Sequence, residues 1–223
     1  YTTMPLGIIA TEENVITVSI KDNSIVKEFA GGAVKNAETN LRTRFILALM
    51  LRVAVRYLQY LKQIEKISNY VETELRASMK NSELLQLLDI EKSLVYFSSS
   101  LKGNQITLEK IMRGRVIKLY EDDQDLLEDV LIEVKQAIEM TTIYLNILSG
   151  TMDAFASVIS NNLNIVMKVL ASITLLFSIP AVISGFYGMN VSNIPMASFW
   201  FPTLITAVCM LIGYFILRRK NML

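Results

Sequence analysis

The chain has 223 residues, of which 52% are apolar and 19% charged, and its formal net charge is +1. This balance excludes an intrinsically disordered chain and argues against a generic polyanion or nucleic-acid binder. Because there is no His and a single Cys, Cys209, the sequence also excludes a Cys/His zinc site, an intrachain disulfide and a Ser-His-Asp or Cys-His catalytic group.

Two short strands are predicted at the amino terminus. Residues 6–10 and 15–20 are rich in β-branched and aliphatic side chains, and the polar Thr-Glu-Glu-Asn between them suits a hairpin turn. Two strands alone are marginal, so we expect them to join strands outside this sequence or to pack on the following helices. Since the first residue is Tyr1 rather than Met, we expect the start of the domain to be missing.

Two long helices are expected next. Asn40 can cap the first, which runs to about residue 79 with apolar residues every three or four positions. The second starts near Ser82, bends near Gly103 and ends at Gly114. Together with the strands, these helices form a partial domain over residues 1–120 that contains a helical hairpin.

A third helix is predicted to be much longer. From Glu121 neither Pro nor Gly occurs until Gly150, and the next Pro is Pro180. One helix from about residue 121 to 186 would be on the order of 100 Å long, more than a membrane requires. We therefore expect residues 121–163 to form a stalk outside the bilayer.

The beginning of this stalk is acidic. The carboxylates are Glu121, Asp122, Asp123, Asp125, Glu128, Asp129, Glu133 and Glu139, with Lys135 as the nearby cation. The helix dipole favours some of them, and a solvated helix face is the simple interpretation of the rest.

Two apolar segments near the carboxyl terminus are long enough to cross a bilayer. Residues 169–187 and 199–217 contain no charged side chain, and Arg218, Arg219 and Lys220 follow the second. We place the membrane-spanning helices at residues 164–187 and 199–217. A connector at 188–198 joins them, and a basic tail at 218–223 follows.

The charges beside these segments predict their orientation. Lys168 precedes the first span and the basic tail follows the second, whereas the connector is uncharged. The expected location is the cell (inner) membrane. By the positive-inside rule, both chain ends are expected on its cytoplasmic side. The connector is then extracellular.

One face of the first span is small or polar. From Asn164, helical spacing gives the following residues: Met167, Ala171, Thr174, Ser178, Ala181 and Gly185. Such a stripe is typical of helix packing within a chain or dimer, and it is equally suited to a pore wall made by several copies. Asn164 lies at the first end of the stripe, and Asn190 follows its last residue, Gly185. Their side-chain amides would therefore lie at the two ends of such a pore.

The residues after this stripe resemble a known family. Tyr-Gly-Met-Asn at 187–190, between two terminal spans and after Pro180 and Gly185, resembles the CorA family of magnesium transporters. The segments 160–170 and 94–104 are also similar, so the resemblance covers most of the chain. Zinc-transporting relatives typically have Ile at the position of Met189, which favours the magnesium branch.

The resemblance implies a mostly α-helical membrane protein. A small β remnant of an α/β cytoplasmic domain precedes a stalk helix that continues into the first of two transmembrane helices. The family forms a homopentamer in which this first helix lines the pore. The implied positions are Gly188, Met189 and Asn190 for ion selectivity, Asn164 for a polar ring, and Met167 and Leu170 for a hydrophobic constriction.

The resemblance also implies a regulatory Mg²⁺ site between subunits. Counting back from Gly-Met-Asn places its stalk carboxylate at Asp129. Asp125 and Glu133 are alternatives, and Asp153 is a weaker candidate. The chain departs from the family pattern at Ser178 and Ala181, where Met and Thr are common, and in its uncharged connector.

These observations predict a channel-like importer of hydrated Mg²⁺, not an enzyme, that is driven by the membrane potential and gated by intracellular Mg²⁺. Co²⁺ and Ni²⁺ are further expected cargoes. No organic cofactor is expected. The expected partners are further copies of the chain and the lipid bilayer, and no nucleic acid is expected to bind. The alternatives are a zinc or other transition-metal transporter of the same architecture, a coupled secondary transporter, and a membrane-anchored signalling or scaffold protein.

Overall fold

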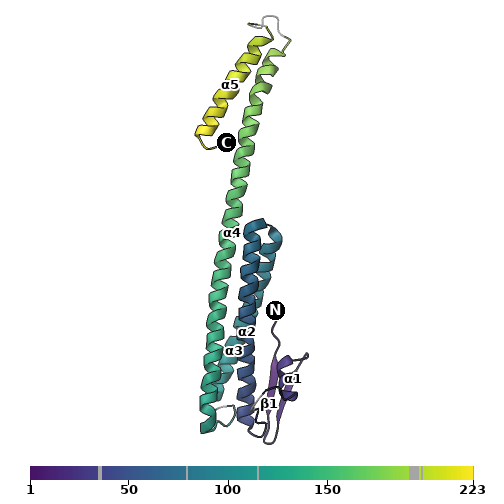
Figure 1. Cartoon of the computed structure of the whole chain (residues 1–223), viewed down its shortest axis with the longest axis vertical. Coiled ribbons are helices and arrows are strands. Elements are labelled where there is room, and N and C mark those ends of the chain that lie inside the picture. The colour runs from purple at the N-terminus through teal and green to yellow at the C-terminus, as the bar shows by residue number, and fades with distance from the viewer. Residues whose placement is uncertain (35–36, 79, 115, 191–195, 197, 223) are drawn as a thin grey trace. The chain divides into compact units, whose positions relative to one another are not determined.

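The computed structural model describes residues 1–34, 37–78, 80–114, 116–190, 196 and 198–222. They divide into two units, residues 1–153 and 154–223. Helix α4 (Gln124–Tyr187) contributes residues to both units (Figure 1).

The predicted hairpin is present in the first unit. Strands β1 (Leu6–Ala10) and β2 (Val15–Ser19) pair antiparallel, with Ile8 opposite Thr17. The backbone N–H of Thr11 donates to the Asn14 carbonyl at 2.8 Å, and the Asn14 N–H donates to Thr11 Oγ1 at 2.9 Å. These two bonds close the turn that the polar residues predicted.

A short helix that sequence reasoning missed follows the hairpin. In α1 (Ser24–Ala30) the Asn23 side chain accepts a hydrogen bond from the Ile25 N–H at 2.9 Å, which caps the helix. Glu28 then pairs with Arg52 Nε at 2.8 Å and with Arg56, both on α2 (Arg42–Ser78). Hydrogen bonds from these two guanidinium groups lower the pKa of the Glu28 carboxyl.

The two long helices have the predicted type and nearly the predicted bounds. Helix α2 begins at Arg42, two residues after the predicted cap at Asn40, and α3 (Asn81–Met112) runs unbroken through Gly103. Gly114 has a φ of 66°, a left-handed conformation that suits glycine and ends the helix. A single 3-10 turn, η1 (Glu121–Asp123), leads into α4.

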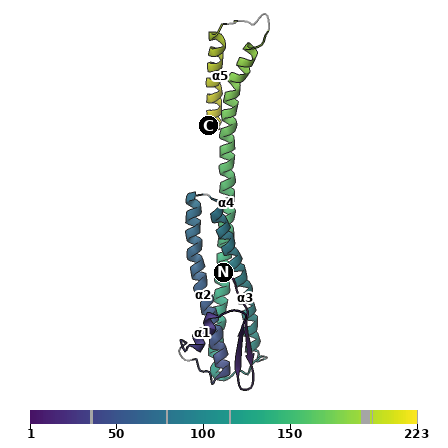
Figure 2. The same cartoon turned by 90° about the vertical axis from the view of Figure 1, so that its right-hand side faces the viewer.

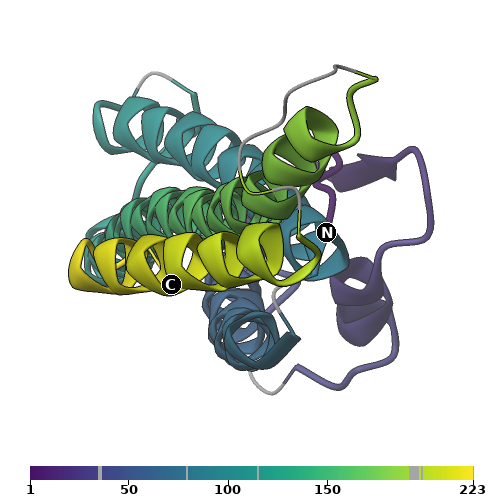
Figure 3. The same ribbon diagram turned by 90° about the horizontal axis from the view of Figure 1, so that it is seen from above.

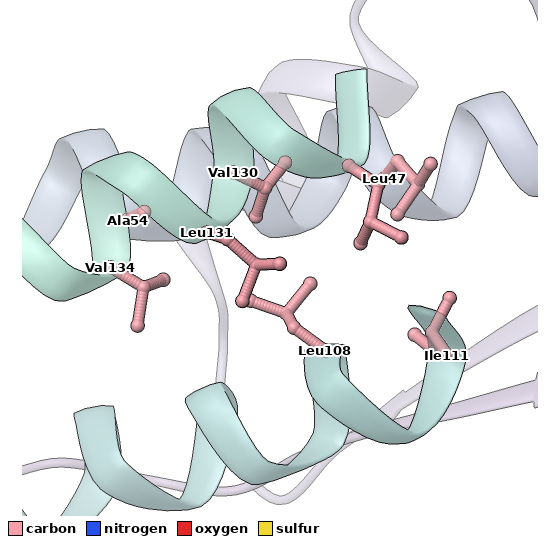
Figure 4. Packing of buried hydrophobic residues seen from close by; sticks show 8 residues of the cluster. Leu47, Ala54, Leu108, Ile111, Val130, Leu131 and Val134 are labelled. Carbon is pink, nitrogen blue, oxygen red and sulfur yellow. The ribbon is translucent and has the colours of Figure 1, made fainter. Parts of the chain in front are cut away.

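A cluster of buried aliphatic side chains joins three helices in this unit (Figure 4). Figures 2 and 3 show α2 and α3 on different sides of α4. The cluster consists of Leu47 and Ala54 from α2, Leu108 and Ile111 from α3, and Leu127, Val130, Leu131 and Val134 from α4. Its burial supplies the main stabilisation of a helical bundle.

A polar contact supplements this cluster further along α4. The hydroxyl of Tyr144 donates to Glu65 Oε2 on α2 at 2.8 Å. Burial, together with the neighbouring Glu65 carboxylate, raises the pKa of Tyr144 to about 12. The phenol therefore remains a neutral donor at physiological pH.

The cluster predicts a large difference between two leucines of α3. Leu108 is 0% exposed and Leu85 is 62% exposed. Leu108→Ala should lower the free energy of unfolding by about 2–5 kcal/mol, because it removes buried methyl groups and leaves a cavity. Leu85→Ala, the matched control, should change it by less than about 0.5 kcal/mol. Denaturation of the purified chain, followed by circular dichroism, measures both; equal losses would contradict the assigned core.

Candidate functional site

Two described helices are long and apolar enough to cross a membrane. They are the helix that ends at Tyr187 and α5 (Trp200–Arg219), which contains the second predicted span. Figures 1 and 2 show α5 beside the carboxyl-terminal part of α4. The connector residues 191–195 and 197 lie outside the described residues.

Helix α5 contacts a single face of α4. A Cβ added at Gly213 would lie 3.2 Å from Leu176 Cδ2 and 3.4 Å from Ile179 Cδ1, so glycine permits this close approach. One turn before Leu176, the Ser172 hydroxyl lies 3.0 Å from the Met222 carbonyl and is buried. Ser172, Leu176 and Ile179 thus define the α5-facing side of α4.

The predicted stripe lies on the opposite side. At 100° per residue its centre is roughly 150° around α4 from the α5-facing side. Leu170 of the predicted constriction is exposed within this chain, as is every predicted residue of the stripe: Asn164, Met167, Ala171, Thr174, Ser178, Ala181 and Gly185. A shallow hollow of about 420 Å³ is lined by Met167, Leu170, Ala171, Thr174, Leu175 and Ser178.

The hydroxyl groups of this stripe present oxygen rather than hydrogen outward. Thr174 Oγ1 donates to the Leu170 carbonyl at 2.8 Å, and Ser178 Oγ donates to the Leu175 carbonyl at 2.7 Å. Each hydroxyl hydrogen is therefore already donated to a backbone carbonyl, while the lone pairs of the hydroxyl oxygen can still accept hydrogen bonds. Such oxygens can accept hydrogen bonds from the water around a cation.

The Gly-Met-Asn residues follow directly after α4. The Gly188 N–H donates to the Ser184 carbonyl at 2.8 Å, and a Cβ at Gly188 would lie 3.1 Å from that same oxygen. Glycine therefore fits at this position, where the Cβ of any other residue would crowd the Ser184 carbonyl oxygen. Met189 and Asn190 are exposed at the end of this turn.

The candidate regulatory carboxylates do not form a metal site within one chain. Asp125 and Asp129 are exposed on the side of α4 away from the buried cluster, Glu133 is half-buried, and Asp153 is exposed. In the part of the chain that the structure describes, no group of three or more His, Cys, Asp or Glu side chains is placed to hold a metal ion. Any such site must draw ligands from elsewhere.

Two residues that organise the site were missed from the sequence. They are Ser172, which lies within an apolar span, and Gly213, which lies within α5. A small residue in an apolar helix is the only sequence signal either one carries, and several neighbours carry the same signal. Their contacts with the partner helix distinguish them.

A comparison with models of known families tests whether the resemblance to CorA transporters reflects family membership. The model described as "CorA-like Mg2+ transporter protein" matches residues 1–219. The chain belongs to this family. It is a family of transporters rather than enzymes.

Two relatives carry the name "Cobalt/magnesium transport protein CorA". The one from Methanocaldococcus jannaschii is 30% identical over 182 residues, which is 79% of this chain and 57% of the relative. The one from Thermotoga maritima is 34% identical over 116 residues, 47% of this chain and 33% of the relative. The chain thus matches little more than half the length of the first CorA protein and a third of the second.

Solved structures share the fold. The complete CorA magnesium transporter from Methanocaldococcus jannaschii has a TM-score of 0.79 at 23% identity, covering 99% of this chain and 76% of that one. The full-length CmaX protein has a TM-score of 0.75 at 20% identity, covering 97% and 68%. The predicted fold class, a mostly helical CorA chain with a small sheet, is confirmed.

The helix contact predicts the effect of enlarging Gly213. Gly213→Val should push α5 away from Leu176 and Ile179 and destabilise the helix pair by about 1–3 kcal/mol, as overpacking does. Ala207→Val is the matched control, since Ala207 is an exposed residue of the same helix. Thermal unfolding in detergent measures both. A Gly213→Val protein as stable as the control would contradict the contact.

Proposed function

We propose that this chain is a subunit of a channel-like importer of hydrated Mg²⁺ in the cell (inner) membrane. The observation that carries the proposal is the uncovered stripe on α4, small and oxygen-lined, on the side opposite α5. Membership of the CorA-like Mg²⁺ transporter family supports the choice of ion. Co²⁺ and Ni²⁺ are proposed as further cargoes.

The chemistry of the stripe suits an ion that keeps its water. Mg²⁺ dehydrates reluctantly and usually retains several waters when it is bound. The hydroxyl oxygens of Thr174 and Ser178 can accept hydrogen bonds from those waters, as can the amide oxygens of Asn164 and Asn190. Because residues 154–223 contain no Asp or Glu, nothing on this wall binds the ion too firmly to release it.

The remaining pore positions follow the family pattern. We assign Gly188, Met189 and Asn190 to selection of the ion at the extracellular entrance, and Met167 and Leu170 to a hydrophobic constriction near the cytoplasm. A membrane potential of 100 mV is worth about 4.6 kcal/mol for a divalent ion, so the potential alone can drive uptake.

The pore requires several copies of the chain, and we propose a homopentamer. A single stripe cannot enclose an ion path. In the first unit, α4 exposes Ile132, Ile143 and Ile147 at 54%, 47% and 58% on the side away from the buried cluster. Exposed apolar side chains aligned on one face favour contact with a neighbouring copy.

We propose that Asp129 binds regulatory Mg²⁺ between neighbouring copies, with Asp125 and Glu133 beside it. Asp125 and Asp129 lie on the same outward face as the exposed isoleucines, where a second subunit can supply further ligands. A bridging divalent cation would relieve repulsion among the stalk carboxylates and hold a closed state. We also propose that both ends of the chain face the cytoplasm, because Lys168 and the basic tail flank the two spans on that side.

The zinc alternative has less support. Soft ligands favour zinc, yet the chain has no His, and Cys209 lies half-buried on α5 rather than on the stripe. Competition between Mg²⁺ and Zn²⁺ for uptake into proteoliposomes separates the two. Zn²⁺ uptake without any Mg²⁺ permeation or competition would favour the zinc carrier.

The selectivity assignment predicts a loss of transport in Asn190→Ala. Removing the amide from every subunit deletes a ring of acceptors, and Mg²⁺ uptake into proteoliposomes should fall at least about tenfold. Asn161→Ala is the control, because Asn161 is an exposed amide of α4 outside the stripe. A magnesium-sensitive dye inside the vesicles reports both rates. Normal uptake by an assembled Asn190→Ala protein would remove Asn190 from the ion path.

The regulatory assignment predicts weaker inhibition in Asp129→Ala. Losing one ligand per site should raise the internal Mg²⁺ concentration that half-inhibits uptake by about tenfold, while uptake at low internal Mg²⁺ persists. Asp89→Ala, a change at an exposed aspartate of α3, should leave that concentration unchanged. The same Mg²⁺ titration in both variants makes the comparison; identical curves would place regulation elsewhere.

A further inference from the structure

The second unit carries positive charge only. Its residues 154–223 include four basic side chains, Lys168, Arg218, Arg219 and Lys220, and no acidic one. All four are exposed, and none forms an ion pair within the described residues. Among the side chains of the second unit that the structure describes, this charge has no neutralising partner.

A defined turn ends α5 beside these residues. Asn221 has a φ of 52°, its N–H donates to the Arg218 carbonyl at 3.1 Å, and the Met222 N–H donates to the Leu217 carbonyl at 3.0 Å. These two bonds and the left-handed residue between them form a Schellman motif. The turn sets the backbone direction at Asn221 and Met222.

A buried serine joins this turn to α4. Ser172 Oγ lies 3.0 Å from the Met222 carbonyl and 2.8 Å from the Lys168 carbonyl, and the residue is 1% exposed. The hydroxyl has a single hydrogen, which it can donate to either carbonyl, and its position between the two forms a bridge from Met222 in the tail to the backbone of α4. Four cations from two segments far apart in the sequence are thus gathered at one end of the helix pair, a cluster we call the basic collar.

Insertion of α5 across a bilayer would place the basic collar at the depth of the lipid headgroups. Helix α5 has 20 residues, about 30 Å at helical rise, and its last two are Arg218 and Arg219. Apolar side chains next to the collar are exposed, among them Val169 and Ile173 on α4 and Phe215 and Ile216 on α5. A ligand of the collar can therefore have an anionic head and an apolar body.

We propose that the basic collar binds the phosphate of an anionic phospholipid. Arginine guanidinium groups bind phosphate with paired hydrogen bonds, and juxtamembrane Lys and Arg residues attract anionic lipid. The adjoining apolar surface accommodates acyl chains, which a free phosphate ion lacks. The proposal depends on insertion of the second unit in a bilayer and not on ion transport.

Spin-labelled lipids test the proposal directly. The full chain is reconstituted in phosphatidylcholine vesicles, and electron paramagnetic resonance compares its association with spin-labelled phosphatidylglycerol and spin-labelled phosphatidylcholine. We expect a preference of about fivefold for phosphatidylglycerol, the effect of one well-placed cation. The triple variant Arg218→Gln, Arg219→Gln, Lys220→Gln should reduce this ratio to about one.

Two further variants separate a built site from simple charge attraction. Replacing Lys62, Lys102 and Lys110 with Gln removes three exposed cations of the first unit, and should leave the ratio unchanged. Ser172→Ala keeps every charge but removes the bridge, and should lower the ratio at least twofold. Circular dichroism and size-exclusion chromatography confirm that each variant is folded and assembled as the unmodified chain is.

Three results would overturn the proposal. The first is an equal lipid preference in the collar variant and the unmodified chain. The second is an unchanged ratio in Ser172→Ala, which would mean that the tail need not be held against α4. The third is loss of the preference on adding inorganic phosphate but not chloride of equal ionic strength, which would assign the collar to free anions. Transport activity enters none of these measurements, so failure here is distinct from failure of the proposed Mg²⁺ function.

Discussion

The packing of α5 on one side of α4 determines what the rest of the second unit can do. Gly213 lets the helix backbones approach, and Ser172 ties the end of the chain to α4. Because these contacts occupy the side with Leu176 and Ile179, the small and hydroxyl residues on the opposite side remain uncovered. In a membrane such a polar face needs water or another helix rather than lipid, and the proposed central pore would supply water.

Two hydroxyl residues on the uncovered side show how an uncharged helix face can offer acceptors to a hydrated cation. Thr174 and Ser178 donate their hydrogens to their own helix, so each turns an acceptor oxygen outward. Waters bound to Mg²⁺ direct their hydrogens away from the ion, so the proposed pore wall would offer them acceptors. Carboxylates are confined to the stalk and the amino-terminal unit, where firm binding suits regulation rather than passage.

In the first unit, the buried cluster sets which side of α4 is available to partners. Leu127, Val130 and Val134 face α2 and α3. As a result, Asp125 and Asp129 are exposed on the other side, together with the apolar side chains of Ile132 and Ile143. An exposed face that combines carboxylates and isoleucines is suited to a contact between copies that responds to divalent cations. In the proposed assembly, neighbouring copies would complete both the pore and the metal site, since one copy supplies only one wall of each.

The sequence by itself predicted the long helices to within a few residues, the hairpin, the two apolar segments and the family. These features depend on local patterns: periodic apolar residues, a left-handed glycine at Gly114, charge-free segments of spanning length, and the Gly-Met-Asn motif. It missed α1, whose single strong signal was the cap at Asn23. Tertiary structure alone decided which side of α4 meets α5, because the small residues Ala171, Ser172 and Thr174 look equivalent in sequence while only Ser172 is buried. It also decided that Lys168 and the tail lie together, because contacts between segments 50 residues apart depend on how two helices pair rather than on either helix alone.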